Sequence, residues 1–347
     1  MTTLWVLAVS LLPLGLGGLS QSPSAEPCDL IRSETLRVNG QREFDTRQFA
    51  AAAANFQQAF DACPRQHAIL LRLSEANVRR KEFEPAIRAA RQFIEFEPGS
   101  TAGELALANA YFVAQRLPEA LQEAENVLKS QPAQPAALKL KGNIEYLSGH
   151  LSEAFDTFIV LLDRHPEDED GAYMLGRIYY QEGRIEQATG QFQRVLRINP
   201  KSYKALDNLG LCYESLGNME MATRYFLTAI KIAGEDAPEY DWAYANLANL
   251  LLEKGDVKKA FAAASKAADR NPFSARNFYL GGKALAQLGK NDLSANWLER
   301  SASLDPKYPE PLYLLARVYA QLGQQDKSKT ALERFRAAKA VAPRERK

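Results

Sequence analysis

Small and bulky apolar residues recur along the chain at fixed positions of a repeat of about 34 residues. When each repeat is numbered so that its late proline is position 32, position 8 is Gly, Ala or Ser in all nine repeats, and so is position 20. Position 7 is mostly Leu, and position 24 is Phe, Leu or Ala. Within each half of the repeat these residues are three, four or seven positions apart, which is the spacing of one face of an α-helix. The pattern therefore predicts two amphipathic helices per repeat, with small residues that let them approach closely.

Proline and glycine mark where the predicted helices end. Consecutive prolines at position 32 are 34 residues apart, except for Pro200 and Pro238, which are 38 apart. Glycines at position 15 follow the same intervals, so both series place one four-residue insertion in the same repeat. Glycine ends a helix at low cost because it adopts left-handed backbone angles, and proline ends one because it lacks an N–H donor. The marker residues are Pro64, Pro98, Pro132, Pro166, Pro200, Pro238, Pro272 and Pro306, and Gly149, Gly183, Gly217, Gly255, Gly289 and Gly323.

Each repeat is predicted to be a helical hairpin that needs neighbours. A lone hairpin leaves one apolar face in water, and stacking on the next hairpin covers that face. The sequence therefore predicts an all-α solenoid, with a signal peptide at 1–25, a linker at 26–32, the repeat array at 33–342 and a basic tail at 343–347. The repeats lie near 33–66, 67–100, 101–134, 135–168, 169–202, 203–240, 241–274, 275–308 and 309–342.

The repeat at 203–240 resembles the tetratricopeptide repeat most clearly. The resemblance is carried by Leu206, Leu209, Gly210, Tyr213, Gly217, Ala222, Phe226 and Ala229. The first three repeats depart from the pattern, because Arg47, Lys81 and Gln115 stand where the later six have glycine. The resemblance implies a right-handed superhelix of paired antiparallel helices, in which the first helix of each pair lines a concave groove.

Composition and motifs point away from catalysis. Lys and Arg total 43 and Asp and Glu total 42, so the chain lacks the charge excess typical of nucleic-acid binding. Three His, three Cys and no Cys-x-x-Cys leave few ligands for a metal site. No His-Glu-x-x-His, Gly-x-Ser-x-Gly or phosphate-binding loop occurs, and the repeats leave no segment large enough for a catalytic domain. We therefore expect no enzyme activity, no cofactor, no metal and no nucleic-acid partner.

The first 25 residues carry no charged side chain and are unlike the repeats. Residues 4–19 form an apolar run, shorter than the roughly 20 residues that span a bilayer, and small polar residues follow. This pattern predicts a secretory signal peptide cleaved near Ser20 or Ala25, and hence a protein that is exported to the periplasm or cell envelope, or secreted. Because no Lys or Arg precedes the apolar run, an uncleaved N-terminal membrane anchor stays as the alternative.

Two of the cysteines are placed symmetrically about the first predicted turn. Cys28 and Cys63 are equally distant from the turn near Asp45 and Thr46, so an antiparallel hairpin would bring them side by side. In an oxidising compartment they would form a disulfide that pins the terminal hairpin, and the alternative is two unrelated thiols. Cys212 lies within a predicted helix and is expected to be a free, buried small residue.

The candidate binding surface is the inner face of the first helices, at positions 2, 5, 6, 9 and 12 or 13. Tyr and Trp there offer flat apolar area with a polar tip, and Asn can bond both backbone groups of an extended peptide. The alternative is that these side chains are ordinary solvated residues. The candidate partner-binding residues are Lys139, Asn143, Tyr173, Arg177, Lys204, Asn208, Trp242, Asn246, Asn249, Tyr279, Lys283, Tyr313 and Arg317.

One sharper form of this hypothesis fits the sequence poorly. Some tetratricopeptide domains grip the C-terminal carboxylate of a partner through five basic and Asn side chains. Lys139, Asn143 and Lys204 match that pattern. Met174 stands where the second Asn belongs, and Asn208 stands where a basic residue belongs.

The function predicted from the sequence is that of an exported, non-catalytic scaffold or assembly factor that holds a protein or peptide partner in its groove. A first alternative is a structural module that self-associates through the ends of the array. A second is a binder of envelope glycans or of the membrane surface that uses the Tyr-rich groove. The basic C-terminal end is a separate candidate for contact with a membrane surface or an acidic partner.

Overall fold

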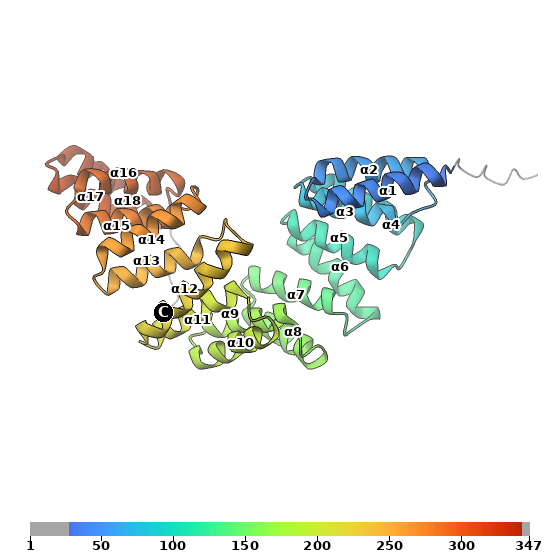
Figure 1. Ribbon diagram of the computed structural model, residues 1–347, viewed down its shortest axis with the longest axis horizontal. Coiled ribbons are helices and arrows are strands. Elements are labelled where there is room, and N and C mark those ends of the chain that lie inside the picture. The colour runs from blue at the N-terminus through green and yellow to red at the C-terminus, as the bar shows by residue number, and fades with distance from the viewer. Residues whose placement is uncertain (1–27, 342–347) are drawn as a thin grey trace, which may run out of the picture. The chain divides into compact units, whose positions relative to one another are not determined.

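The computed structural model describes residues 28–341, and all regular structure in that range is α-helical (Figure 1). The predicted signal peptide at 1–25 and the tail at 343–347 lie outside the described residues. The prediction of an all-α array of about nine helical pairs is confirmed. The helices are α1 (Leu30–Asp45), α2 (Phe49–Ala62), α3 (Ile69–Arg79), α4 (Phe83–Phe96), α5 (Thr101–Val113), α6 (Leu117–Ser130), α7 (Pro135–Leu147), α8 (Leu151–Arg164), α9 (Glu169–Gln181), α10 (Ile185–Ile198), α11 (Tyr203–Ser215), α12 (Met219–Asp236), α13 (Trp242–Glu253), α14 (Val257–Arg270), α15 (Ala275–Gln287), α16 (Asn291–Leu304), α17 (Pro309–Gln321) and α18 (Gln325–Val341).

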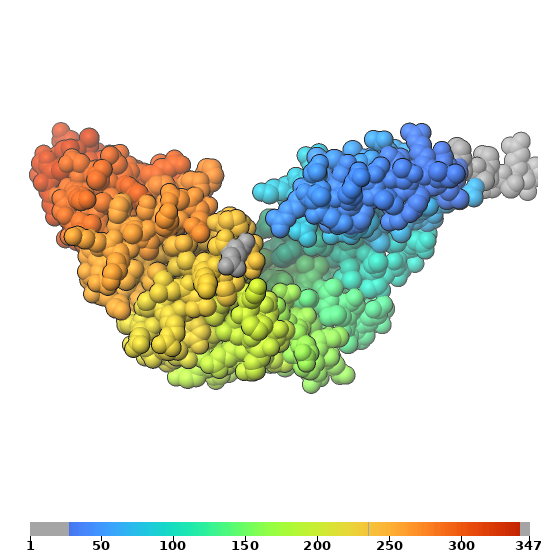
Figure 2. Space-filling model, in the orientation of Figure 1, coloured from blue at the N-terminus to red at the C-terminus, as the bar shows by residue number. Residues whose placement is uncertain are grey.

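The helices form two compact units, divided after Asn126, which we call the N-terminal unit and the C-terminal unit. From α1 to α5 in the first and from α7 to α18 in the second, each helix packs against the next in sequence. In the space-filling view successive colours therefore form contiguous bands (Figure 2). In the C-terminal unit the first helix of each repeat also contacts the first helix of the next repeat, as α11 contacts α13. The second helices of successive repeats make no comparable contacts with one another. The surface formed by α7, α9, α11, α13, α15 and α17 is called the first-helix face below.

The two helices of a repeat are fitted together by residue size at positions 8 and 24. Phe226 is fully buried on α12 and packs on Gly210 of α11. A Cβ atom on Gly210 would lie 2.3 Å from Phe226 Cε1, so no larger residue fits there. In the next repeat position 8 is Ala248 and position 24 is Ala264, so the two residues change size together. The same glycine–phenylalanine contact joins Gly142 to Phe158 and Gly176 to Phe192.

Every first helix ends in the same left-handed turn, with or without glycine. Gly149 has a φ of 80°, and the later repeats match it. In the first three repeats φ is 61° at Arg47, 63° at Lys81 and 60° at Gln115. These repeats therefore keep the turn and change only the residue, although a Cβ atom in the left-handed region costs free energy.

Replacing Gln115 by Gly is expected to raise the free energy of unfolding by about 0.5–1 kcal/mol, because glycine has no Cβ atom to clash in this turn. The reverse change, Gly217→Gln, should lower it by about 1 kcal/mol. No atom lies within 4 Å of the Cβ position at Gly217, so this control introduces no clash with a neighbouring side chain. Urea unfolding followed by far-UV circular dichroism measures both, and a lower midpoint for Gln115→Gly would contradict the strain.

The four-residue insertion lengthens one second helix. α12 has 18 residues, whereas α8, α10, α14 and α16 have 14 each. Ala233 in the added turn and Ala237 directly after it are both buried. Tyr240 and Trp242 follow directly and line a pocket of the first-helix face.

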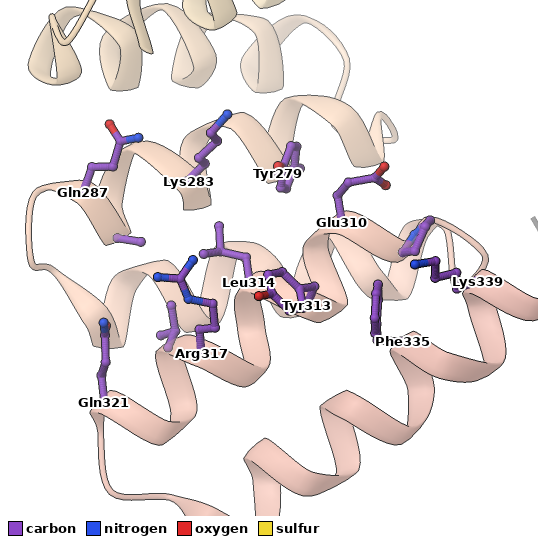
Figure 3. Close-up of a pocket in the computed structure, with 13 residues that line it drawn as sticks. Tyr279, Lys283, Gln287, Glu310, Tyr313, Leu314, Arg317, Gln321, Phe335 and Lys339 are labelled. Atoms are coloured by element: carbon purple, nitrogen blue, oxygen red, sulfur yellow. The ribbon is translucent and has the colours of Figure 1, made fainter. Parts of the chain in front are cut away.

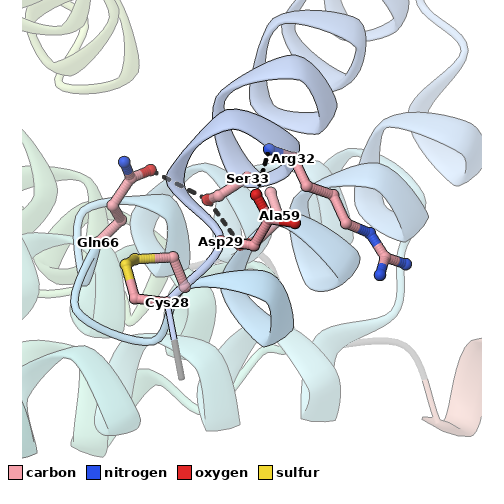
Figure 4. Close-up of a disulfide and its surroundings, with 7 residues drawn as sticks. Cys28, Asp29, Arg32, Ser33, Ala59 and Gln66 are labelled. Carbon is pink, nitrogen blue, oxygen red and sulfur yellow. Dashed lines mark hydrogen bonds between the residues drawn. A yellow bond between two sulfur atoms is a disulfide. The ribbon is translucent and has the colours of Figure 1, made fainter. Parts of the chain in front are cut away.

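A disulfide joins Cys28, just before α1, to Cys63, just after α2 (Figure 4). Beside it the hydroxyl of Ser33 donates a hydrogen bond to the carbonyl oxygen of Ala59 at 2.7 Å. The start of α1 is therefore tied to the end of α2 by a covalent bond and by a buried hydrogen bond. Among the described residues α1 packs mainly on α2, so this link stabilises a helix that has few packing partners in that range.

The number of reactive thiols tests the disulfide. Cys212 is buried and free, and burial raises the pKa of its thiol to about 11. In denaturant without reductant one thiol per chain, that of Cys212, should react with iodoacetamide, and three should react after reduction. Reduction should also lower the thermal midpoint, because closing a loop of 35 residues contributes about 3–4 kcal/mol. If mass spectrometry finds three reactive thiols before reduction, the disulfide between Cys28 and Cys63 is absent.

Candidate functional site

Two large pockets lie along the first-helix face of the C-terminal unit. The first, called the polar pocket, has a volume of about 780 Å³ and is lined by side chains from α7 to α15. The second, called the aromatic pocket, has a volume of about 960 Å³ and is lined by α15, α17 and α18. Both are built largely from positions 2, 5, 6, 9, 12 and 13 of the first helices.

Asp207 lies at the floor of the polar pocket and anchors a hydrogen-bond network across three repeats. It is 2% exposed and accepts hydrogen bonds from the Tyr240 hydroxyl at 2.7 Å and from Asn246 Nδ2 at 2.9 Å. Asn246 Oδ1 in turn accepts a hydrogen bond from Arg276 Nη2 at 2.7 Å. The guanidinium carbon of Arg276 lies 5.6 Å from the centroid of the Trp242 ring. A buried carboxyl group thus fixes a cation and an aromatic ring at the pocket surface.

Burial raises the pKa of Asp207 to about 6. Loss of water disfavours the charged carboxylate more than the hydrogen bonds from Tyr240 and Asn246 and the charge of Arg276 favour it. Burial and the neighbouring Asp207 also raise the pKa of Tyr240, so its hydroxyl keeps its proton and stays the donor. Asp207 is therefore an acid of this pocket whose charge changes close to neutral pH.

The rest of the polar pocket wall comes from α7, α9 and α11. Tyr173 and Arg177 lie on α9, and Lys204 and Asn208 lie on α11. Asn208 Nδ2 donates a hydrogen bond to the Tyr173 hydroxyl oxygen at 3.1 Å. The guanidinium carbon of Arg177 lies 4.8 Å from the centroid of the Tyr146 ring. These contacts hold the rings and the amide in place before any partner binds.

The aromatic pocket has aromatic rings and cations on facing helices (Figure 3). Tyr279 and Lys283 project from α15, and Tyr313 and Arg317 from α17. The Tyr313 ring is 5.4 Å from the ring of Phe335 on α18, and Tyr313 is 48% exposed. The pocket can therefore bury apolar groups beside positive charge.

Most of the residues predicted from the sequence line pockets on this face. Asn246 differs from the others because it is buried, at 3% exposed, and cannot contact a partner directly. Its amide nitrogen is hydrogen-bonded to Asp207 and its amide oxygen to Arg276. We therefore assign Asn246 a positioning role. The polar pocket holds Tyr173, Arg177, Lys204, Asn208, Trp242 and Asn246, the aromatic pocket holds Tyr279, Lys283, Tyr313 and Arg317, and Asn143 lines an adjoining pocket with Tyr173, Arg177 and Lys204.

Lys139 and Asn249 line none of these pockets and are bound within the chain. Lys139 Nζ lies 3.2 Å from a carboxylate oxygen of Asp168 and 3.1 Å from one of Asp170. Asn249 Nδ2 donates a hydrogen bond to Glu253 at 3.1 Å. Since the charge of Lys139 is already compensated, the carboxylate-gripping hypothesis loses one more of its residues.

Several residues of the pockets were not predicted. Arg276 stands at position 2, like Trp242, so its place in the repeat carried a usable signal. Tyr240 stands two residues after Pro238, as Tyr308 does after Pro306, but this position of the repeat was not among the predicted groove positions. Phe335 belongs to the last second helix, where no further repeat follows among the described residues. Asp207 is buried like Ala245 at position 5 of the next repeat, but the sequence offers no signal that a carboxyl group is buried at this position.

Two features common in other protein classes are missing from residues 28–341. In that range no helix is both long and apolar enough to cross a membrane. Within the same residues no three His, Cys, Asp or Glu side chains come together as a metal site would require.

Tetratricopeptide-repeat family models match nearly the whole array, so the chain belongs to the tetratricopeptide-repeat family. All of the matching models describe this repeat, and none describes an enzyme. No curated protein matches the sequence. The matched residues are 38–101, 105–169, 170–202, 202–272, 282–323 and 312–338.

Solved structures share the fold at low sequence identity. A tetratricopeptide repeat protein from Parabacteroides merdae is 19% identical, with a TM-score of 0.57 over 78% of this chain and 98% of its own. The Cut9–Hcn1 hetero-tetramer of the APC/C contains a chain that is 16% identical, with a TM-score of 0.65 over 82% of this chain and 56% of its own. PilF of Pseudomonas aeruginosa is 16% identical, with a TM-score of 0.54 over 62% of this chain and 97% of its own.

Asp207 is expected to make folding stability depend on pH. Its pKa of about 6 in the folded state lies above its ordinary value of 3.8, so the folded state binds this proton more tightly than the unfolded state does. The stabilisation is fully present below about pH 4 and is lost as the pH rises through about 6, with a total of about 2–3 kcal/mol.

Urea unfolding of the natural chain and of Asp207→Asn between pH 4 and pH 7.5 measures this effect. The variant cannot ionise at this position, so its free energy of unfolding should lack the component that falls as the pH rises. If the free energy of unfolding changes with pH in the same way for both chains, the pKa of Asp207 is not raised in the folded state.

Proposed function

We propose that this chain is a non-catalytic scaffold that holds a segment of a partner protein on its first-helix face and acts outside the cytoplasm. One observation carries the proposal: an exposed aromatic ring lines each of the two pockets of this face. Trp242 is 57% exposed in the polar pocket, and Tyr313 is 48% exposed in the aromatic pocket. Large rings left in water at hollowed sites are typical of surfaces that a protein partner covers.

The pocket residues are held ready for binding. Arg276 is fixed by Asn246, and Tyr173 by Asn208. Side chains that are already ordered lose little entropy when a partner binds, which favours affinity. The related Cut9–Hcn1 structure is a hetero-tetramer, so the same fold accompanies a partner in that complex.

Action outside the cytoplasm is supported by two features of the N-terminal end. The sequence at 1–25 has the pattern of a secretory signal, and a disulfide closes the first helical hairpin. Structural disulfides persist in oxidising compartments and are rare in the cytosol. An uncleaved N-terminal anchor is the alternative form of the same localisation.

Site-specific crosslinking tests the first-helix face. A benzophenone amino acid at Trp242 or Tyr313 should yield one dominant partner adduct in living cells, because both rings lie in the proposed binding surface. The same residue at Leu227, 51% exposed on the second helix α12, is the matched control and should yield none. Equal adducts from all three positions would place the contact elsewhere, and an adduct of twice the chain mass would indicate self-association.

A reporter fusion tests export. Residues 1–32 joined to an alkaline phosphatase that is active only after export should give enzyme activity, and the mass of the full chain recovered from cells shows whether cleavage occurs near Ser20 or Ala25. A fusion that starts at Cys28 is the control and should be inactive. Equal activity of the two fusions would contradict export through this segment.

A further inference from the structure

The polar pocket and the aromatic pocket together hold an excess of positive charge, whereas the adjoining pocket with Asn143 has as many acids as cations. Some cations elsewhere on the surface have acidic partners, as Arg116 does in Glu119 at 2.7 Å. None of the pocket cations forms an ion pair with a carboxylate of the described residues. The cations lining the two pockets are Arg177, Lys204, Arg276, Lys283, Arg317 and Lys339.

The acidic residues of the two pockets do not balance these cations. Asp207 is buried and already accepts two hydrogen bonds, and Glu310 lies at the edge of the aromatic pocket (Figure 3). The two pockets therefore have six cations against two acids, although the whole chain has a formal charge of only +1. Unpaired cations that face a binding surface favour a negatively charged partner.

The two pockets are linked along the face by a chain of contacts. Arg276 lines the polar pocket and also a small pocket that contains Tyr308. The Tyr308 ring lies 5.4 Å from the ring of Tyr279, which lines the aromatic pocket. One ligand that follows the face can therefore contact both pockets.

We infer that the partner segment is an extended acidic stretch of polypeptide whose carboxylates meet these cations and whose apolar side chains enter the aromatic pocket. This inference rests on the function proposed above and specifies the chemical character of the partner segment. From α9 to α17 there are four steps between contacting first helices, and at 8–10 Å per step and about 3.3 Å per extended residue the segment has about 10–12 residues.

The walls of the aromatic pocket favour a polypeptide over an acidic glycan. Leu314 and Val318 line it together with Ala286 and Phe335. Aliphatic walls bury side chains such as Leu or Tyr, whereas a sugar carries hydroxyl groups that would lose their hydrogen bonds there. An acidic glycan is therefore treated as a competing outcome in the test.

Fluorescence polarisation with defined peptides tests the inference on the purified chain. The probe is a labelled 12-residue peptide that alternates Glu with Leu or Tyr. We expect saturable binding that weakens at least tenfold in Lys283→Glu/Arg317→Glu, since the variant replaces two attractions by two repulsions. The matched control is Lys258→Glu/Lys266→Glu on the second helix α14, which changes net charge equally and should bind within twofold of the natural chain.

Three further probes separate the explanations. A peptide with Lys in place of Glu, and one with Ser in place of Leu and Tyr, should each bind at least tenfold more weakly. Polygalacturonate should compete only at much higher carboxylate concentration. If the Lys peptide binds tightly, the acidic preference is wrong. If that binding is then lost in Tyr279→Ala/Tyr313→Ala, the proposed groove function still stands. Polygalacturonate that competes as well as the Glu peptide, or equal loss of binding in both charge variants, would also overturn the inference.

Discussion

The close approach of the two helices within each repeat is the constraint from which the rest of the structure follows. At Gly210 and Phe226 there is no room for even one more carbon atom, and where position 8 grows to Ala248 its partner shrinks to Ala264. This fit sets the angle of each hairpin, and the stacking of equal hairpins brings the first helices side by side. Positions 2, 5, 6 and 9 then gather on one face, because the other sides of each first helix are taken up by packing.

Elements and faces could be predicted from the sequence because both depend on local periodicity. The repeat marked the helix ends, and the groove positions identified most residues that line the two pockets. Hydrogen-bond partners could not be predicted in this way. Lys139 and Asp170 are 31 residues apart and meet only because successive repeats stack, and nothing in the pattern says that this pair forms while Lys204 stays unpaired.

The nearly neutral composition conceals an uneven distribution of charge. A formal charge of +1 argued correctly against a chain that binds through bulk charge, but it says nothing about how charges are divided between faces. In the C-terminal unit several acids pair on helix surfaces, as Asp256 does with Lys259, whereas the two pockets hold six cations and two acids. The composition of a repeat protein is therefore a poor guide to its working surface, since each position of the repeat selects charge separately.

The network at Asp207 also changes how the array is expected to come apart. In a simple solenoid each repeat contacts only its immediate neighbours, and unfolding can begin at an end and advance one repeat at a time. Asp207, Asn246 and Arg276 belong to three successive repeats and are joined in series by two hydrogen bonds. Unfolding the middle repeat alone would break both hydrogen bonds of Asn246, which would leave the buried Asp207 and the guanidinium of Arg276 without this partner. We therefore expect these three repeats to unfold together as one cooperative unit, unlike the rest of the array.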